Sequence, residues 1–237
     1  MKIALLTTQT PHHAYFASKL EAEGHELGII CETSFVKFPY ETSHTYEKRR
    51  DDFERHHWFE GKDISLSSFG TFMEVENINC EKANDFLADF GAGLSLCFGV
   101  RKISLSTLSE LGLNTFNFHG ADPEKYRGLD SQLWALWHKD YSELKTCLHQ
   151  LNDTLDDGGI FSVLPIDFVK VKKIETLRII NTENCVQLAV RLISELSHSK
   201  KLVLKKQNQQ GKYYSAMPSV LKDVVVRRFA SEGLPEQ

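Results

Sequence analysis

The chain has 237 residues, of which 41% are hydrophobic and 25% are charged, so disorder is excluded as its dominant state. This length favours one α/β domain with a small appendage. Twenty-eight basic side chains against 32 acidic ones give a formal charge of −4, which disfavours a dedicated nucleic-acid-binding protein.

The N-terminal pattern predicts a strand, a helix and a second strand. KIALLTT is a short β-rich run, HHAYFASKLEAEG has helical spacing and ends at Gly24, and LGIICE is typical of a buried strand. This order indicates a right-handed parallel crossover. It places the loop 9–13 at the carboxyl edge of the sheet, where open α/β sheets bind ligands.

Residues 35–62 interrupt this pattern as an insertion, with an amphipathic helix expected over 42–59. The alternation then resumes with a helix at 81–90, strands at 94–99 and 113–119, a helix at 130–138, strands at 144–151 and 159–166, and a helix at 174–196. The last forty residues lack strong periodicity. We predict an α/β, Rossmann-like fold with a mainly parallel twisted sheet, a catalytic domain over 1–197 and a small C-terminal extension over 198–237.

Two polar side chains end the predicted strand 113–119. Asn117 and His119 are two positions apart, so both point to the same face of the sheet. An imidazole there could carry a proton, while the amide N–H donates to an oxyanion, as acyl transfer requires. The alternative is that Asn117 caps a turn and His119 is a core histidine with satisfied hydrogen bonds.

Two loops that follow strands strengthen the functional interpretation. GADPEKYRG comes directly after His119, and an acidic turn at 156–159 follows His149. A buried Asp156 could reach His119, orient its ring and stabilise the imidazolium. The acidic turn alone would be an ordinary turn, but each of these groups follows the end of a predicted strand.

In these residues the sequence resembles the formyltransferase family that uses 10-formyltetrahydrofolate. The resemblance covers about residues 90–165 well. Asn117 and His119 match the family's Asn-x-His, and HQLNDTLDDG matches its His-x6-Asp-x-Gly, which makes Asp156 the family aspartate. The resemblance implies that Asn117 binds the oxyanion, His119 takes the proton of the attacking amine, and Asp156 fixes His119. Gly159 departs from the family, since many members have proline there.

The resemblance also implies a donor site for 10-formyltetrahydrofolate, whose pterin enters between two loops. The corresponding residues here are Val100, Arg101, Lys102, Ile103, Asn152 and Asp153. A flat heterocycle suits such a slot because it buries apolar area while fixed backbone amides contact its edge. Solvated charges on a loop are an equally good account of the Arg101 and Lys102 side chains.

The identity of the acceptor rests on differences between branches of the family. The glycine-free loop TTQTPHHAYF disfavours the phosphate cradle of glycinamide ribonucleotide formyltransferases. Only about forty residues follow the long helix, too few for a tRNA-binding domain, and the chain begins on its first strand, without the regulatory domain of the deformylases. YRGLDSQLWALW and GKYYSAMP are similar to segments of the amino-sugar N-formyltransferases.

We therefore expect formyl transfer to the amine of an amino-deoxy sugar. The sugar is expected to be nucleotide-linked and destined for a surface polysaccharide such as the O-antigen of lipopolysaccharide. The candidate acceptor-binding residues are Tyr126, Arg127 and His13, although a structural role is favoured for Arg127. The alternatives are another small amine as acceptor, or a catalytically silent protein that binds a nucleotide sugar.

Further expectations concern metals, compartment and assembly. Adjacent histidines such as His12–His13 and His56–His57 cannot converge on one ion from a helix, so no metal is predicted and solvated positions are expected for them. The five cysteines form no CxxC pair and are expected to be reduced. No apolar run is long enough for a membrane span or a signal peptide, so a cytoplasmic location is expected. Aromatic and apolar residues in the insertion and tail suggest a homodimer.

Overall fold

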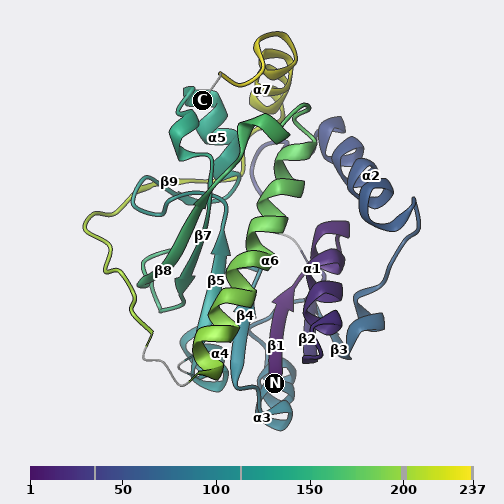
Figure 1. The fold of residues 1–237 in the computed structure, drawn as a ribbon, viewed down its shortest axis with the longest axis vertical. Helices are drawn as coiled ribbons and strands as arrows, with labels where there is room; N and C mark the ends of the chain where they lie inside the picture. The colour runs from purple at the N-terminus through teal and green to yellow at the C-terminus, as the bar shows by residue number, and fades with distance from the viewer. Residues whose placement is uncertain (35, 113, 199–201, 236–237) are drawn as a thin grey trace.

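The computed structural model describes residues 1–34, 36–112, 114–198 and 202–235 (Figure 1). Its centre is a seven-stranded sheet of order β3-β2-β1-β4-β5-β7-β8. The strands are β1 (Lys2–Thr7), β2 (Glu26–Glu32), β3 (Thr71–Val75), β4 (Leu94–Cys97), β5 (Thr115–His119), β7 (Lys145–Gln150) and β8 (Ile160–Pro165). Neighbours from β3 to β5 pair in parallel, and β7 pairs antiparallel with both β5 and β8. The predicted Rossmann-like, mainly parallel sheet is confirmed.

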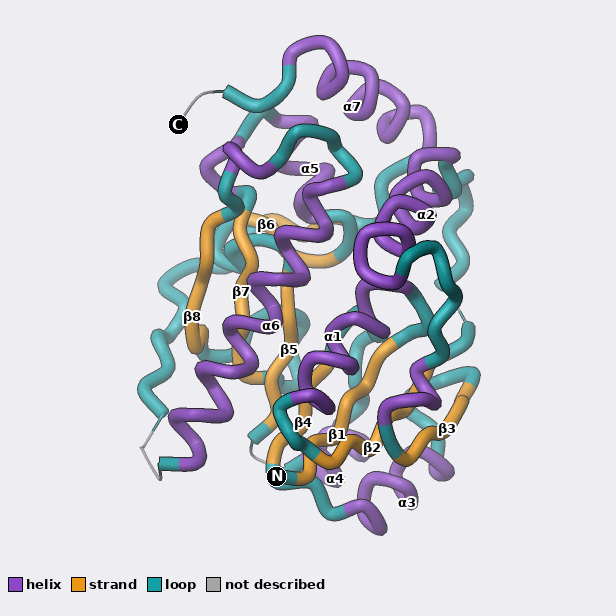
Figure 2. The backbone as a smooth tube through the Cα atoms, turned by 45° about the vertical axis from the view of Figure 1, so that its right-hand side comes forward, coloured by secondary structure: helices purple, strands orange, loops and turns teal. Residues whose placement is uncertain are grey.

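Helices cover both faces of this sheet (Figure 2). They are α1 (Pro11–Ala22), α2 (Thr45–Phe59), α3 (Glu81–Phe90), α4 (Leu105–Leu111), α5 (Ser131–His138), α6 (Thr176–Ser197) and α7 (Ser219–Glu232). Ile3 and Leu5 of β1 pack with α1 and α6, whereas Ala4 and Leu6 pack with α3 and α4. This alternation explains why β1 is an unbroken apolar run, since both of its faces are buried. Within the described ranges, no helix combines the length and apolarity that a membrane crossing requires.

The predicted elements in the middle of the chain are found with small shifts at their ends. The helix expected over 42–59 begins only at Thr45, because His44 and Glu47 form a capping box there. The strand expected over 113–119 begins at Thr115, and Leu113 lies outside the described residues. The strand β3 and the helix α4 were not predicted. β3 is a five-residue edge strand and α4 has only seven residues, so neither has a clear period.

The C-terminal segment is more ordered than its sequence pattern indicates. The strand β9 (Lys212–Tyr214) pairs in parallel with β6 (Tyr126–Gly128), and α7 packs against α5. Val225 and Phe229 of α7 are buried in this contact, but Val220 and Val224 are exposed. The apolar residues of α7 therefore do not all lie on the buried face. The strand β9 has only three residues, which is too few to show a period. The division of the chain near residue 197 stays a prediction.

The turn between β7 and β8 has no room for a side chain at Gly158. A Cβ atom on Gly158 would lie 1.6 Å from the carbonyl oxygen of Gln150. We predict that Gly158→Ala lowers the free energy of unfolding by about 3 kcal/mol, because the turn must move away from β7. Urea denaturation measures this change. Gly93→Ala is the control, since the nearest atom to its Cβ is 4.0 Å away, and an equal loss in both variants would contradict the explanation.

Candidate functional site

A cavity of about 630 Å³ lies at the carboxyl ends of the central strands. Thr8 and Thr10 after β1 and Gly99 after β4 line one side of it. Asn117 and His119 of β5 line another, and residues of the 152–156 loop and of α6 complete the wall. This is the edge where open α/β sheets place their ligands, as expected for the loop after β1.

His119 is the last residue of β5 and is held by two neighbours. Its Nε2 lies 2.8 Å from the carbonyl oxygen of Tyr126 and 3.3 Å from the hydroxyl of Ser131. A carbonyl oxygen only accepts, so Nε2 carries the proton of the neutral imidazole and donates it to Tyr126. The lone pair is then on Nδ1, which makes Nδ1 the basic atom of this side chain.

Asp156 lies beside this ring in a backbone conformation that few non-glycine residues adopt, with a φ of 51°. One carboxylate oxygen accepts the N–H of Gly128 at 2.9 Å, and the other lies 3.8 Å from Nδ1 of His119 and 3.5 Å from Nε2 of His149. Burial raises the pKa of Asp156. The positive charges that His119 and His149 carry when protonated, together with the Gly128 N–H, outweigh this effect and hold the pKa well below its usual range.

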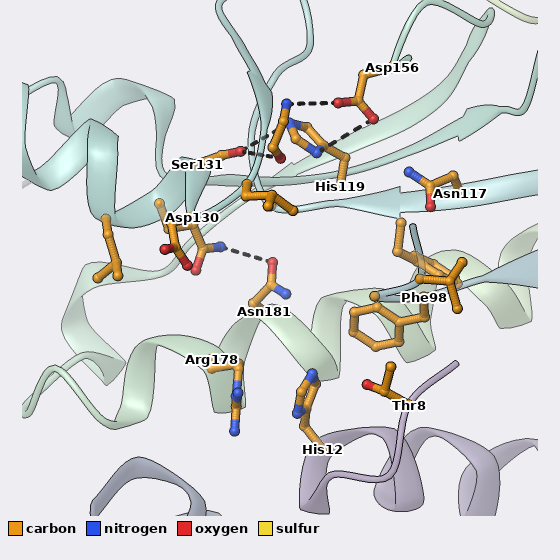
Figure 3. Close-up of a pocket in the computed structure, with 18 of the residues that line it drawn as sticks. Thr8, His12, Phe98, Asn117, His119, Asp130, Ser131, Asp156, Arg178 and Asn181 are labelled. Carbon is orange, nitrogen blue, oxygen red and sulfur yellow. Dashed lines mark hydrogen bonds and ion pairs between the residues drawn. The ribbon is translucent and has the colours of Figure 1, made fainter. Parts of the chain in front are cut away.

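Asn117 joins the same group of side chains (Figure 3). Its amide nitrogen lies 3.2 Å from Nε2 of His149 on the neighbouring strand β7. The structure thus brings Asn117, His119 and Asp156 together, with His149 as a fourth member that contacts both Asn117 and Asp156. The sequence analysis found His149 in the motif, but the spacing of the motif did not indicate which side chains His149 would contact.

Tyr126 and Arg127 do not line the cavity. The guanidinium of Arg127 is buried and donates to the carbonyl of Leu155 at 3.3 Å and to Asp157 at 2.7 Å. The hydroxyl of Tyr126 donates to the carboxylate of Asp140, which does not line the cavity, at 3.2 Å. These positions disagree with the prediction that the two side chains contact the acceptor. Both side chains form hydrogen bonds with other segments of the chain instead. Arg127 ties down the loop that bears Asp156, in line with the structural role favoured for it.

The six residues expected at the donor site divide into two groups. Val100, Lys102 and Asn152 line the cavity. Arg101 is turned away, and its guanidinium lies 2.5 Å from the buried carboxylate of Glu32. Ile103 is buried in the apolar core, and Asp153 is exposed outside the cavity wall. Arg101, Ile103 and Asp153 are therefore not among the residues that line the cavity, although each is adjacent in sequence to one that is.

The histidine pair at the start of α1 is buried, so the prediction of solvated positions was wrong for it. His12 and His13 line the cavity, and His13 packs edge-on against Phe98, with ring centroids 4.5 Å apart. Nδ1 of His13 donates to the carbonyl of Thr8 at 2.8 Å. Burial lowers the pKa of both, that of His13 to about 3. The first turn of α1 faces the sheet edge rather than solvent, whereas His56 and His57 are exposed as expected.

Helices α2 and α6 supply further cavity residues that the sequence analysis did not predict. Arg178 and Asn181, one turn apart on α6, face the cavity. Arg178 donates to both carboxylate oxygens of Glu54 on α2, at 2.6 Å each. The pairing joins the 35–62 insertion to the cavity wall. No local pattern distinguished them, because α6 carries other polar residues such as Glu183, Gln187 and Arg191. No group of three or more potential metal ligands occurs among the residues that the structure describes.

No protein-family model and no curated protein matches the sequence. Solved structures do match its fold. HypX from Aquifex aeolicus, in complex with tetrahydrofolic acid, has a TM-score of 0.59 and 14% identity over 98% of this chain and 34% of its own. A 4-N formyltransferase from Francisella tularensis has a TM-score of 0.58 and 13% identity over 90% of this chain and 76% of its own.

A third match is PseJ from Anoxybacillus kamchatkensis, a formyltransferase in complex with UDP-4,6-dideoxy-4-formamido-L-AltNAc and tetrahydrofolate. Its TM-score is 0.56 at 13% identity, over 99% of this chain and 94% of its own. This chain spans about a third of the length of HypX. At such identities the likeness shows the fold, which is the Rossmann-like formyltransferase fold.

The buried histidine pair predicts how stability depends on pH. An unfolded histidine binds a proton below about pH 6.5, whereas folded His13 does so only near pH 3. The unfolded chain therefore binds more protons, and the free energy of unfolding falls as the pH falls, by about 1.4 kcal/mol per pH unit for His13 once the pH is below about 6. Urea denaturation between pH 6 and pH 5 measures this slope. His13→Phe should reduce the slope by that amount. The exposed control His57→Phe should leave it unchanged, and equal slopes in both would contradict the burial argument.

Proposed function

We propose that this protein moves a formyl group from 10-formyltetrahydrofolate to the amine of an amino-deoxy sugar. The observation that carries the proposal is the meeting of an amide, an imidazole and a carboxylate at one cavity wall. Asn117 and His119 come from β5, and Asp156 comes from the loop after β7. Formyl transfer needs an oxyanion donor, a base for the attacking amine and an acid for the leaving nitrogen, and this group of side chains can supply all three.

His119 would act through Nδ1. Its Nε2 proton is engaged by the carbonyl of Tyr126, so the attacking amine gives its proton to Nδ1. The new imidazolium has the Asp156 carboxylate 3.8 Å away, a distance at which opposite charges attract strongly in a buried site. The nitrogen–carbon bond forms to the acceptor, the bond to the folate nitrogen breaks, and the proton passes to that nitrogen.

Asn117 would stabilise the charge that develops on the formyl oxygen. Its amide nitrogen is placed by the contact with His149, and an amide has two N–H groups, so one is left for the substrate. The tyrosine carbonyl, rather than Asp156, fixes the ring of His119. We therefore assign to Asp156 the stabilisation of the imidazolium, not the orientation of the ring.

The folate supplies the formyl carbon, and the site has features that suit it. Val100 and Lys102 face Asn152 and the loop that leads to Asp156 around one cavity, as two loops that enclose a flat ring must. Two of the structural neighbours hold tetrahydrofolate. Both observations support a folate co-substrate, with the pterin between these loops.

For the acceptor, we propose an amino-deoxy sugar linked to a nucleotide and destined for a surface polysaccharide. The PseJ complex contains a UDP-linked formamido sugar, which supports this substrate class. In this chain, Tyr213 is 60% exposed and lines the cavity, where its ring could stack on a sugar or a base. His13, which also lines the cavity, would contact the acceptor. Another small amine, or binding without turnover, is the alternative to be tested.

The catalytic assignments predict how three variants behave. Asn117→Ala should lower kcat about a hundredfold, because one oxyanion donor is lost. His119→Ala and Asp156→Asn should also lower kcat, because the proton acceptor or its counter-charge is missing. The assay mixes 10-formyltetrahydrofolate with nucleotide-linked amino sugars and follows tetrahydrofolate release and the mass of the formylated sugar.

Calorimetric titration with tetrahydrofolate is the control, and the three variants should bind it within about threefold of the wild type, because none removes the pterin-binding loops. A wild-type protein that binds the sugar but never releases tetrahydrofolate would support the silent binding protein instead. Wild-type kcat in Asn117→Ala would contradict the assigned roles.

A further inference from the structure

A chain of buried polar side chains lies behind the cavity, between α6, α5 and β7. Asn181 of α6 accepts hydrogen bonds from Gln132 at 2.9 Å and from Thr146 at 2.8 Å. Asn184, one turn further along α6, donates to Thr146 at 3.3 Å and to the carbonyl of Pro165 at 3.1 Å. Asn181 and Gln132 line the cavity, whereas Thr146 and Asn184 do not.

These contacts determine which way the Asn181 amide faces. Asn184 already donates to the hydroxyl of Thr146, so the hydroxyl proton is left to donate to Asn181. The atom that receives bonds from both Thr146 and Gln132 must be the Asn181 carbonyl oxygen. Its amide nitrogen is therefore on the other side, and its one contact within the described residues is a weak one of 4.0 Å to the sulfur of Cys185.

Asn181 is only 8% exposed, and its amide group borders the cavity. Figure 3 shows the side chain projecting from α6 into the space between His119 and His12. A buried N–H group without a good acceptor costs free energy, so ligand sites are where such groups are expected.

The amide pair also lies next to the reacting centre. Gln132 follows Ser131, whose hydroxyl contacts His119 at 3.3 Å, and its side chain packs over Gly120, which directly follows His119. The loops assigned to the folate border the cavity elsewhere, at 100–102 and 152–156. Asn181 therefore belongs to the part of the wall that faces the amine acceptor.

The charged neighbour of Asn181 is engaged elsewhere. Arg178, which also lines the cavity, donates two hydrogen bonds to Glu54, and a second carboxylate, that of Asp51, lies against the same guanidinium. A neutral amide beside a neutralised arginine suits an uncharged polar group better than a phosphate. This wall thus favours the sugar part of an acceptor.

We propose that Asn181 is a specificity-determining residue, whose amide nitrogen donates to an oxygen of the acceptor sugar next to the reacting amine. The oxygen is that of a hydroxyl group or the carbonyl of an acylamino group, which share the same hydrogen-bond-accepting chemistry. The inference rests on the proposed function and adds the group that the site recognises. Gln132 and Thr146 act through Asn181 as positioning residues.

The test measures sugar binding directly, so that it does not depend on turnover. The probes are UDP-linked amino-deoxy hexoses that carry an acetamido group, a hydroxyl group or hydrogen at one ring carbon beside the amine. The wild type should bind at least one of the first two about tenfold more tightly than the deoxy sugar, as expected for one hydrogen bond. The better-bound of the two oxygen sources identifies the group.

Asn181→Ala should bind all three probes alike, at the affinity of the deoxy sugar. Asn184→Ala is the matched control, since it disturbs the same buried network but does not face the cavity. Gln132 still donates to the Asn181 carbonyl in this variant, so it should retain the tenfold preference. Thermal unfolding of both variants shows whether they are folded. If Asn181→Ala does not fold, the preference of the wild type among the three sugars still decides.

Equal affinity of the wild type for the three sugars, or no binding of any, would overturn the assignment of Asn181. So would an equal loss of preference in Asn181→Ala and Asn184→Ala, which would make the effect structural. Tetrahydrofolate binding and formyl transfer, measured on the wild type alone, decide the proposed function separately.

Discussion

The site depends on a buried carboxylate that is held between two imidazoles. In the interior, the Asp156 anion is stabilised by the Gly128 N–H and by the charge of His119 or His149 when that ring binds a proton. Its own backbone is strained, with a φ of 51°. The loop keeps this conformation because Arg127 is buried beneath it and bonds the carbonyl of Leu155, one residue before Asp156. Local strain is thus maintained by tertiary contacts, as is common at functional sites.

A backbone carbonyl and a side-chain carboxylate have different roles around His119. A main-chain carbonyl from β6 fixes the tautomer of His119, which leaves the carboxylate available as a counter-charge. β6 is in turn held by its pairing with β9 of the C-terminal segment. A stretch more than eighty residues further along the chain therefore helps to determine which nitrogen of His119 is basic.

The sheet edge and the helices above it contribute different properties. Strand ends and their loops supply Asn117, His119 and Asp156, because parallel strands all end at the same edge. α6 supplies a polar wall with Arg178 and Asn181, and the salt bridge between Arg178 and Glu54 joins it to α2 of the insertion. The buried His12 adds a further uncharged ring, since burial lowers its pKa. This side of the cavity is therefore polar, and its Arg178 is paired with two carboxylates.

The sequence by itself determined the parallel sheet, the strand-end positions of Asn117 and His119, and the aspartate that follows His149. These features depend on local periodicity and on the order of elements, which are read directly from the chain. Only the tertiary structure decided that His12 is buried, that Arg127 points away from the cavity and that Asn181 faces it. Each of these depends on contacts between segments far apart in sequence, which no local pattern records. A polar residue in a helix has the same local signature whether it faces solvent or a ligand.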